Sequence, residues 1–386
     1  MELNRIYNEN CLDTLARMPN NFLDCVVTSP PYYGLRSYGT EPQIWDANPN
    51  CPHVWGEEMA NPKTDTRPIE LKVSQGATVG SNVASQHWAQ GTMGSYCQNG
   101  LICGAWRGEL GLEPRFQDYI RHLLQIFAEV KRVLKPDGCV FVNLGDSFNG
   151  AKDSNTIHSS TSTLHANSDT YIEDLQSMKI GKRLQSGVRR KSLLNIPHRF
   201  FIGMTDELQF IQRNNINWWK RACMPSSAKD RWTVDFESIG FFTKNERYTF
   251  NQQLDAYTAP LDRWGGDELV ATQSEGWHTG TGQPIYRDRN MRPNPEGRNQ
   301  RTTWDIPFEP SGNEHYASYP TRLVERMILA GSNEGDIVYD PFGGTATTAV
   351  TAHKLGRQWL CSELQPKYVE ISNDRLEPYL AQSSLF

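Results

Sequence analysis

The sequence lacks any run of about 18 apolar residues, which is the length that a membrane-spanning helix requires. Its mean hydropathy is −0.61, and its first ten residues show no signal-peptide pattern. Eight cysteines are scattered along 386 residues, a length that supports a sizeable core without disulfide staples. These absences predict a protein of the reducing cytoplasm without membrane spans.

A basic excess is also missing, because the net charge is −5 at pH 7 and the isoelectric point is near 6.0. Any nucleic-acid-binding surface must therefore be local. Two segments fit that description. Residues 179–191 contain cations without acids, and residues 254–303 interleave tryptophans with arginines, a mixture that suits base and backbone contacts. Solvated surface is the ordinary alternative for such a charged run.

Residues 24–28 are predicted to form a short buried strand, because an apolar run is bounded there by turn residues. Ser29-Pro30-Pro31-Tyr32 must end that strand, since proline has a fixed φ and no N–H. The result is a rigid elbow at the carboxyl end of a strand, where open α/β sheets bind ligands. Its hydroxyl, carbonyls and tyrosine face suit a flat group with an amine, such as a nucleobase. A proline-rich turn with a packing tyrosine explains the same residues.

A second motif combines a strand, a glycine-bearing turn and a helix. The strand covers residues 337–339, and the turn contains Asp340, Pro341, Phe342, Gly343, Gly344, Thr345, Ala346 and Thr347. Glycines let backbone N–H groups approach a ligand, and the helix N-terminus favours negative charge. Glu363 ends the next strand about 20 residues beyond the turn, where an acid can accept the hydroxyls of a ribose. This order of elements indicates an adenosine-containing cofactor.

Residues 40–103 show neither a helical nor a strand period and are too long for an ordinary connection, which predicts an insertion. Four candidate metal ligands lie near its two ends: Cys51, His53, Cys97 and Cys103. One tetrahedral zinc ion could close the long loop on these ligands. The spacings C-x-H and C-x5-C are irregular, and free cysteines with an unrelated histidine are the alternative.

Periodic patterns supply the rest of the predicted core. Apolar residues recur every three or four positions from Phe116 to Leu134, which predicts an amphipathic helix ended by Lys135-Pro-Asp-Gly138. Strands are predicted at residues 139–144, 215–220 and 239–244, and a further helix at residues 197–212. Asp13 lies where a predicted strand meets a helix, so it either stabilises the helix N-terminus or accepts a hydrogen bond from a cofactor.

Two motifs together carry a family resemblance. Thr28-Ser-Pro-Pro-Tyr32, followed much later by Asp340-Pro-Phe-Gly-Gly-Thr-Ala-Thr-Thr348, resembles the amino-methylating DNA methyltransferases in the permuted order of their beta class. Trp218-Trp-Lys220 and His315-Tyr-Ala-Ser-Tyr-Pro320 are among the supporting stretches. Two positions depart from the family pattern: Ala346 replaces the last glycine of F-x-G-x-G, and the usual C-x-x-C is stretched to C-x5-C.

The resemblance implies methyl transfer from S-adenosylmethionine to the exocyclic amine of a base flipped out of DNA. Ser29 and the Pro30 carbonyl would accept the amine hydrogens within the catalytic set Ser29, Pro30, Pro31 and Tyr32, while Tyr32 stacks on the base. The cofactor would be held by Asp13, Thr28, Pro320, the turn from Asp340 to Thr347, and Glu363. Family members with serine at the first elbow position mostly make N4-methylcytosine, so cytosine N4 is the expected target and adenine N6 the alternative.

The fold that the resemblance implies is α/β, with a seven-stranded, mostly parallel, doubly wound sheet. Residues 1–39, 104–250 and 310–386 would form the catalytic domain. Residues 40–103 would form the insertion with the candidate zinc ligands, and residues 251–309 the target-recognition region. Double-stranded DNA is the expected partner, and a homodimer and a cognate restriction endonuclease remain open as further partners.

Three other functions fit the sequence less well. Cytosine-C5 methylation needs a cysteine nucleophile, usually after proline, and the chain contains no Pro-Cys dipeptide. A nicotinamide or flavin enzyme could use the glycine turn and Glu363, but it would leave Ser-Pro-Pro-Tyr unexplained. A non-catalytic DNA-binding relative is disfavoured because both motifs are intact. No residue excludes RNA as the substrate.

Overall fold

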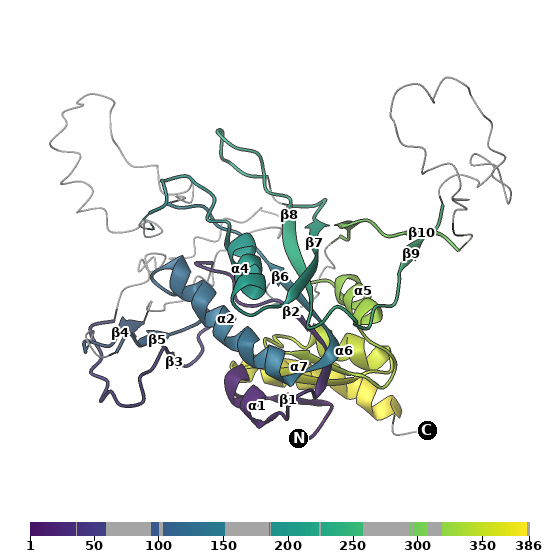
Figure 1. Cartoon of the computed structure of the whole chain (residues 1–386), viewed down its shortest axis with the longest axis horizontal. Helices are drawn as coiled ribbons and strands as arrows, with labels where there is room; N and C mark the ends of the chain where they lie inside the picture. Colours follow the sequence, from purple (N-terminus) through teal and green to yellow (C-terminus); the bar gives the residue numbers. More distant parts are fainter. Residues whose placement is uncertain are drawn as a thin grey trace, which may run out of the picture.

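The computed structural model of the chain describes residues 1–35, 37–58, 94–99, 103–150, 185, 187–223, 225–257, 294, 296–307 and 319–383. Figure 1 shows a large twisted sheet with helices packed around it and smaller β-elements to its sides. None of the helices in these ranges is long and apolar enough to cross a membrane.

An eight-stranded sheet forms the centre, in the order β1-β13-β12-β2-β6-β8-β7-β11. Neighbouring strands are parallel except in the two pairs that involve β8, which runs antiparallel to β6 and to β7. The strands are β1 (Arg5–Tyr7), β2 (Leu23–Thr28), β6 (Leu134–Leu144), β7 (Ile211–Trp219), β8 (Phe236–Thr243), β11 (Thr303–Asp305), β12 (Ile337–Asp340) and β13 (Gln358–Ser362). The predicted α/β fold with a mostly parallel sheet is confirmed, with eight strands in place of seven.

Three details of the predicted elements were wrong. The additional strand, β11, holds only three residues, and so short a strand leaves no periodic pattern in the sequence. The helix predicted over residues 197–212 ends much earlier, as α4 (Ile196–Asp206), because Gln209 adopts a left-handed φ of 54° and Ile211 already belongs to β7. β6 begins at Leu134, although its pairing with β2 is irregular before Cys139.

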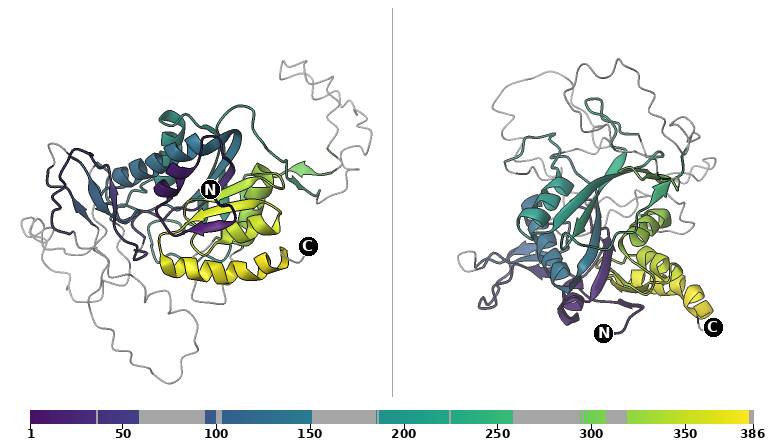
Figure 2. Two further views of the ribbon diagram at one scale, coloured as in Figure 1. Left: turned by 90° about the horizontal axis from the view of Figure 1, so that it is seen from below. Right: turned by 45° about the vertical axis from the view of Figure 1, so that its right-hand side comes forward.

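Helices cover both faces of the sheet, as the two views of Figure 2 show. α1 (Cys11–Arg17), α2 (Phe116–Val133) and α4 pack on one face, and α5 (Thr321–Gly331), α6 (Thr347–Lys354) and α7 (Pro366–Ser383) pack on the other. Successive side chains of β6 point to opposite faces of the sheet, so this strand contributes to the apolar clusters on both faces. Val140 and Val142 join the apolar cluster under α2, whereas Cys139 and Phe141 join the cluster under α5.

The order of the strands places the topological switch point of the sheet, where α/β proteins form their ligand-binding crevice, at the boundary between β12 and β2. From β12 the chain continues through α6 to β13 on one side, and from β2 it continues to β6 on the other side. Open α/β sheets bind ligands where the connections diverge in this way, outside the carboxyl ends of the strands. Asp340 ends β12 and Thr28 ends β2, so both sequence motifs begin at this boundary.

The inserted segment contributes a small sheet of its own. β3 (Gln43–Trp45), β5 (Trp106–Gly108) and β4 (Ser95–Tyr96) form an antiparallel sheet in that order. A second small pair joins β9 (Leu254–Asp255) to β10 (Arg298–Asn299). Figure 1 places the three-stranded sheet beside α2, at a distance from the β9–β10 pair.

Candidate active site

Asp340 is the centre of the crevice between β12 and β2. Its side chain, 1% exposed, accepts hydrogen bonds from the hydroxyls of Thr28 and Thr348 at 2.6 Å each and of Tyr319 at 3.0 Å. The backbone N–H of Phe342 donates to the same carboxylate at 3.0 Å. Burial raises the pKa of Asp340, and the hydrogen bonds offset that rise only in part. The Thr28 bond fixes the end of β2 against the glycine turn.

The glycine turn folds back onto the end of β13. Gly343 donates its N–H to the Ser362 carbonyl at 2.9 Å, and a Cβ on Gly343 would lie 2.9 Å from the Cβ of Cys361, so only glycine fits there. Glu363 accepts the N–H of Gly344 at 2.8 Å. Burial raises the pKa of Glu363 to about 7. Ala346, the residue that replaces a family glycine, has a left-handed φ of 61° at the N-cap of α6.

The remaining predicted cofactor residues lie at the ends of neighbouring elements. Asp13 is in the first turn of α1, but Asn10 caps that helix by accepting the N–H of Leu12 at 2.9 Å. The Tyr7 carbonyl, at the end of β1, accepts the N–H of Glu363 at 3.0 Å, so the chain before α1 joins the same sheet edge. Pro320 is the N-cap residue of α5, directly after Tyr319.

The elbow extends from the end of β2 into a polar network. Tyr32 donates its hydroxyl to Glu237 Oε2 at 2.6 Å, and Asn143 Nδ2 lies 2.7 Å from Tyr32 Oη and 2.8 Å from Glu237 Oε2. Ser29 Oγ lies 3.4 Å from the same tyrosine oxygen. Gly145 must be glycine, because a Cβ there would lie 2.6 Å from the ring of Tyr32. Burial and the Glu237 charge raise the pKa of Tyr32 well above its usual value.

Two of the four elbow carbonyls, those of Pro31 and Tyr32, have partners. The Pro31 carbonyl accepts the hydroxyl of Tyr119 at 2.7 Å, and the Tyr32 carbonyl accepts the N–H of Leu35 at 3.3 Å. Among the residues that the structure describes, no hydrogen bond reaches the carbonyl of Pro30. The elbow therefore presents one hydroxyl and one carbonyl to an incoming hydrogen-bond donor.

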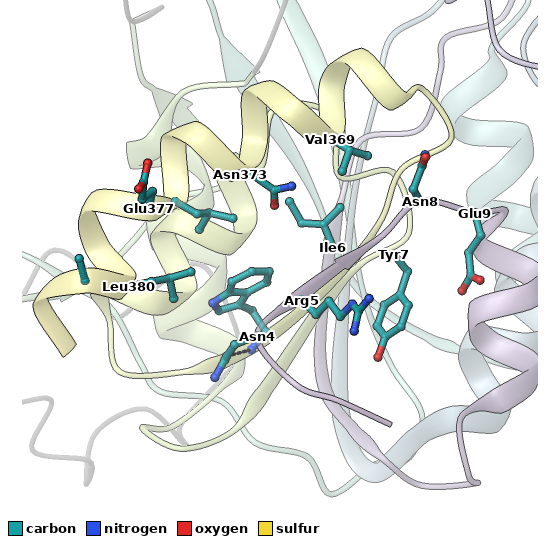
Figure 3. A pocket seen from close by; sticks show the side chains of 13 residues that line it. Asn4, Arg5, Ile6, Tyr7, Asn8, Glu9, Val369, Asn373, Glu377 and Leu380 are labelled. Atoms are coloured by element: carbon teal, nitrogen blue, oxygen red, sulfur yellow. Dashed lines mark hydrogen bonds between the residues drawn. The ribbon is translucent and has the colours of Figure 1, made fainter. Parts of the chain in front are cut away.

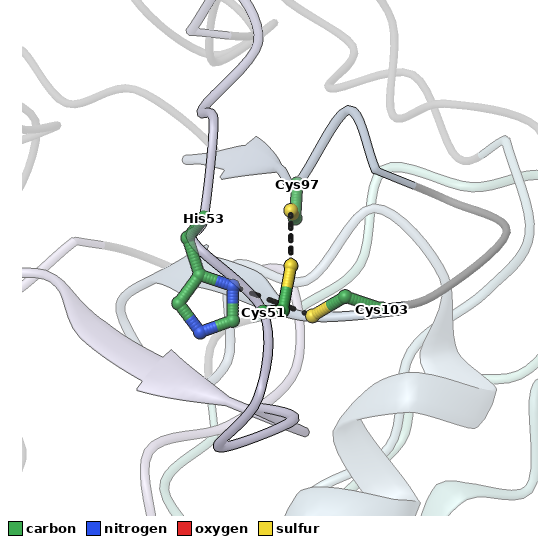
Figure 4. A group of neighbouring side chains, drawn as sticks. All are labelled: Cys51, His53, Cys97 and Cys103. Carbon is green, nitrogen blue, oxygen red and sulfur yellow. Dashed lines mark hydrogen bonds between the residues drawn. The ribbon is translucent and has the colours of Figure 1, made fainter.

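The four candidate metal ligands come together beside the three-stranded sheet. The ligand atoms of Cys51, His53, Cys97 and Cys103 all lie within 4.8 Å of one another, and Figure 4 shows them converging. Cys51 Sγ is 3.8 Å from Cys97 Sγ, and Cys103 Sγ is 3.3 Å from His53 Nδ1. Sulfur ligands about 2.3 Å from a tetrahedral zinc ion would lie about 3.8 Å apart, so the spacing suits that ion.

Comparison with known proteins agrees with this geometry. A family model described as DNA methylase (N6_N4_Mtase) matches residues 23–374, which is most of the chain and includes both motifs. The chain belongs to this DNA methylase family. Membership makes the protein an amino-methylating DNA methyltransferase and confirms S-adenosylmethionine, expected from the sequence, as the methyl donor.

Named relatives of this methylase cover nearly its whole length. The Type II methyltransferase M.Cfr9I of Citrobacter freundii is 26% identical over 98% of the chain and 89% of its own length. M.XycI of Xanthomonas campestris pv. cyanopsidis is 26% identical over 96% of the chain and 87% of its own length. Among solved structures, the PvuII DNA methyltransferase (cytosine-N4-specific) shares the fold with a TM-score of 0.51 and 16% identity, covering 96% of the chain and 85% of its own.

A buried acid–imidazole–acid group attaches the inserted sheet to the methylase core. His122 on α2 is fully buried, with Nδ1 2.9 Å from Glu113 Oε1 and Nε2 3.1 Å from Asp46 Oδ2. Its ring stacks between Trp45 of β3 and Trp106 of β5, with ring centroids 4.7 and 5.6 Å away. We call Asp46, His122 and Glu113 the His122 triad.

The His122 triad also reaches the elbow. Glu113 Oε2 accepts the N–H of Gly111 at 2.8 Å, and the Gly111 carbonyl accepts the N–H of Gly34 at 2.7 Å. A Cβ on Gly111 would lie 3.2 Å from the Tyr32 carbonyl, so this glycine packs directly on the elbow. The inserted sheet and the catalytic motif are thus joined through a short series of hydrogen bonds.

Much of the predicted DNA-contacting surface lies outside the described residues. This applies to Lys179, Lys182, Arg183, Trp264, Trp277, Arg287, Arg289 and Arg292. Of the basic run, the described residues Arg189, Arg190 and Lys191 are exposed, and Lys191 forms an ion pair with Asp230 at 2.6 Å. Arg298 and Arg301 lie at the β10 end of the predicted recognition region.

A separate cavity of about 720 Å³ opens between β1 and α7, as Figure 3 shows. Ile6, Trp359 and Leu376 give it an apolar wall, and Arg5 and Glu377 are among its polar residues. None of the predicted site residues lines this cavity. It lies along the outer edge strand of the sheet, so it does not define the active site.

Sequence reasoning missed four side chains that complete the site: Asn143, Glu237, Tyr319 and Thr348. Asn143 lies one residue before the end of β6. Polar residues at the carboxyl ends of parallel strands often contact ligands, so this position was a signal in the sequence. Tyr319 and Thr348 were within quoted motifs without an assigned role. Glu237 offers no local signal, because it begins an ordinary strand.

Proposed function

We propose that this methylase transfers a methyl group from S-adenosylmethionine to N4 of a cytosine flipped out of duplex DNA. The hydrogen bond of 2.6 Å between Thr28 and Asp340 supports the proposal most directly. It joins the end of the elbow strand to the start of the cofactor turn, so the two sequence motifs form one site. Ser29, the next residue, is then beside the crevice in which the cofactor binds.

The chemistry of the elbow suits an exocyclic amine. Such an amine is a poor nucleophile because its lone pair is delocalised into the base. Ser29 Oγ and the carbonyl of Pro30 accept its two hydrogens, which draws the nitrogen towards a tetrahedral geometry and turns its lone pair towards the methyl group. Positioning of this kind supplies much of the rate enhancement without a covalent intermediate. Tyr32 stacks on the flipped base.

The crevice fits a nucleoside cofactor that carries positive charge. S-adenosylmethionine, when bound, supplies the methyl group as part of a sulfonium. The ribose hydroxyls donate to Glu363, and Gly343, whose missing Cβ lets the turn pack against Cys361, keeps the turn beside the end of β13. Asp13 and Pro320 complete the binding set with the turn residues from Asp340 to Thr347. Asp340 and Glu363 both have raised pKa values, so a cationic ligand would stabilise their ionised forms.

Cytosine is favoured over adenine by the serine at the first elbow position, which in this family mostly accompanies N4 methylation. The shared fold of the cytosine-N4-specific PvuII enzyme is consistent with this choice. Adenine N6 is the second candidate, because the same two acceptors serve either amine. The region of residues 251–309 reads the DNA sequence. A homodimer and a cognate restriction endonuclease are further candidates as partners, since the named relatives are Type II methyltransferases.

Nucleoside mass spectrometry tests the target. Unmethylated bacterial DNA is incubated with the protein and S-adenosylmethionine that carries a labelled methyl group, and the DNA is digested to nucleosides. The label should appear on N4 of deoxycytidine. Label on deoxyadenosine alone would refute the base assignment and leave the elbow chemistry standing, and label on neither nucleoside would refute the function.

Ser29→Ala is the matching variant. It removes one amine acceptor and touches no cofactor residue, so the rate of methyl transfer should fall by about 10²- to 10³-fold, as when an oriented hydrogen-bonding group is lost from an active site. The dissociation constant of S-adenosylmethionine, measured by calorimetry, should stay within twofold. A near-normal rate would eliminate the proposed role of Ser29.

We also propose that Cys51, His53, Cys97 and Cys103 bind one structural zinc ion that orders the inserted sheet. Metal analysis of protein purified without chelators should give about one zinc per chain, and Cys97→Ala should lose it. Cys223→Ala is the control, since this half-buried cysteine lies outside the cluster. Zinc-free wild-type protein, or a Cys97→Ala variant that keeps its zinc, would contradict the proposal.

A further inference from the structure

Glu237 stands at the centre of the network below the elbow, although it follows the elbow by 205 residues in the sequence. It is the second residue of β8, and its side chain is 15% exposed. Tyr32 Oη and Asn143 Nδ2 both donate to its Oε2, at 2.6 and 2.8 Å. Lys220 forms an ion pair with the other oxygen, Oε1. All three groups therefore donate to one carboxylate.

Counting protons fixes the direction of each hydrogen bond. An ionised carboxylate can only accept, so the single hydroxyl proton of Tyr32 points to Glu237. An amide nitrogen can only donate, so Tyr32 Oη accepts one bond from Asn143 Nδ2 at 2.7 Å. The opposite orientation of the amide would place Asn143 Oδ1 against the carboxylate. Among the side chains that the structure describes, Ser29 Oγ, 3.4 Å away, is the donor that remains for the other lone pair of Tyr32 Oη.

We propose that Glu237 is a positioning residue that acts through Tyr32 to keep the Ser29 hydroxyl an acceptor for the target amine. With its own proton turned towards Tyr32 Oη, Ser29 Oγ presents lone pairs to the amine. Glu237 also anchors the tyrosine hydroxyl, so the ring that stacks on the base stays fixed against Gly145. This inference rests on the proposed function, because it concerns the same elbow and the same amine.

Lys220 determines what a neutral substitute for Glu237 would do. In Glu237→Gln, the ammonium group of Lys220 attracts the amide oxygen and repels the amide NH₂. The NH₂ then faces Tyr32 Oη and Asn143 Nδ2, the two groups that donate to Oε2 in the wild-type protein. Tyr32 Oη thereby loses the acceptor that holds its proton, and Asn143 loses the acceptor that fixes its amide. The hydrogen bonds that turn the Ser29 proton towards Tyr32 Oη are therefore no longer fixed, although the variant keeps the shape of the site.

The first measurement is the single-turnover rate of methyl transfer by Glu237→Gln, with labelled S-adenosylmethionine and unmethylated DNA. We expect the rate to fall roughly 10- to 100-fold, as for a misoriented reacting group. The dissociation constants of DNA and of S-adenosylmethionine should stay within twofold of wild type. Glu129→Gln is the control, because Glu129 forms an ion pair with Arg132 at 2.8 Å on α2, away from the elbow. Its rate should be unchanged.

A double-mutant cycle with Tyr32→Phe separates positioning through Tyr32 from a general structural role. Tyr32→Phe keeps the ring and removes the hydroxyl that connects Glu237 to Ser29. The double variant Tyr32→Phe/Glu237→Gln should react no more than about twofold more slowly than Tyr32→Phe alone, since the connection is already absent. Rate losses that multiply would overturn the inference, because Glu237 would then act by another route.

The remaining outcomes are also decisive. A wild-type rate in Glu237→Gln, or loss of cofactor affinity in parallel with the rate, would overturn the positioning role while the wild-type enzyme still methylates DNA. Absence of methyl transfer to DNA by the wild-type protein would instead refute the proposed function. The wild-type assay thus distinguishes the two failures.

Discussion

The methylase contains two regions with buried acids, and an aspartate in one region, Asp46, has a pKa shift opposite to that of an aspartate in the other, Asp340. In the His122 triad, burial raises the pKa of Asp46, but hydrogen bonds from His122 and Arg121 outweigh it and lower the pKa well below its usual value. In the cofactor crevice, the donors to Asp340 are hydroxyls and a backbone amide, and its pKa is raised. Glu363 follows the same rule, with backbone amides as partners and a pKa of about 7.

The opposite pKa shifts of Asp46 and Asp340 indicate different roles for the two regions. Asp46 has Arg121 and His122 as partners within the protein, so it can hold the inserted sheet against α2 without a ligand, although burial raises the pKa of the third triad member, Glu113. The crevice has negative groups whose neighbours are neutral, which leaves part of their stabilisation to a bound ligand. A cofactor with a sulfonium and an amino group supplies the missing positive charge. Matched substitutions in the two regions test this contrast.

The largest effect is expected from Asp46→Asn, which neutralises the triad acid without changing its shape. Asparagine accepts the left-handed φ of 57° at this position, so the loss reflects the missing charge and one missing hydrogen-bond acceptor, without backbone strain. We expect the free energy of unfolding at pH 6 to fall by about 2 kcal/mol, less than for a fully buried pair because the Asp46 side chain is 17% exposed. Urea unfolding measures this loss. An unchanged urea midpoint of unfolding would contradict the proposed difference between the His122 triad and the cofactor crevice.

The pH dependence of Asp46 and His122 gives an independent check. The pKa of His122 is raised, so its stabilisation is complete below its ordinary value of 6.5 and is lost as pH rises through the raised pKa. The pKa of Asp46 is lowered, so its stabilisation is present above 3.8 and is lost as pH falls through the lowered pKa. Asp46→Asn should therefore be most destabilising between these two limits.

A smaller effect is expected for cofactor binding by Glu363. With a pKa of about 7, the carboxylate is ionised in only about one tenth of the molecules at pH 6, so S-adenosylmethionine should bind about tenfold more weakly there than at pH 8. In Glu363→Gln this dependence should disappear. Calorimetry at each pH gives the affinities of wild type and of Glu363→Gln for S-adenosylmethionine. The cofactor's own amine titrates equally in both measurements, so its effect cancels in the ratio of wild-type to variant affinity.

The stability of the free protein should show the opposite trend for Glu363. Its folded pKa lies above its ordinary value of 4.5, so the folded state holds more protons between pH 4.5 and about 7. This group therefore lowers stability as pH rises through that interval. A ratio of affinities that does not change with pH would show that Glu363 does not titrate in the crevice.

The smallest change in stability is expected from Asp340→Asn, the counterpart of Asp46→Asn. The substitution removes a charge that burial disfavours, and this gain offsets the weaker acceptance of hydrogen bonds from Thr28 and Tyr319. The free energy of unfolding at pH 8 should stay within about 1 kcal/mol of wild type. Cofactor affinity should fall at the same time. A loss of stability as large as that of Asp46→Asn would show that the two regions do not differ.

The sequence by itself determined the parts of the site that depend on local backbone chemistry. Two prolines must end the strand before Tyr32, whatever the rest of the chain does. Gly344 adopts a left-handed φ of 51°, a conformation that glycine reaches without a steric penalty. Periodicity predicted α2, and the family resemblance implied the doubly wound, mostly parallel sheet, which the structure has. The four cysteine and histidine ligands were also placed together correctly, because closing one loop requires its two ends to meet.

Only the tertiary structure decided which distant side chains complete these motifs. Glu237 reaches Tyr32 because β8 runs antiparallel beside β6, which in turn is paired with β2. The His122 triad joins Asp46 of the inserted segment to two residues that follow the segment, and β11 joins the sheet with only three residues. Periodicity cannot report such contacts, since each depends on strand order and register. The hydrogen-bond polarity at Ser29 is fixed by a residue 205 positions beyond Tyr32, so it exists only in the folded chain.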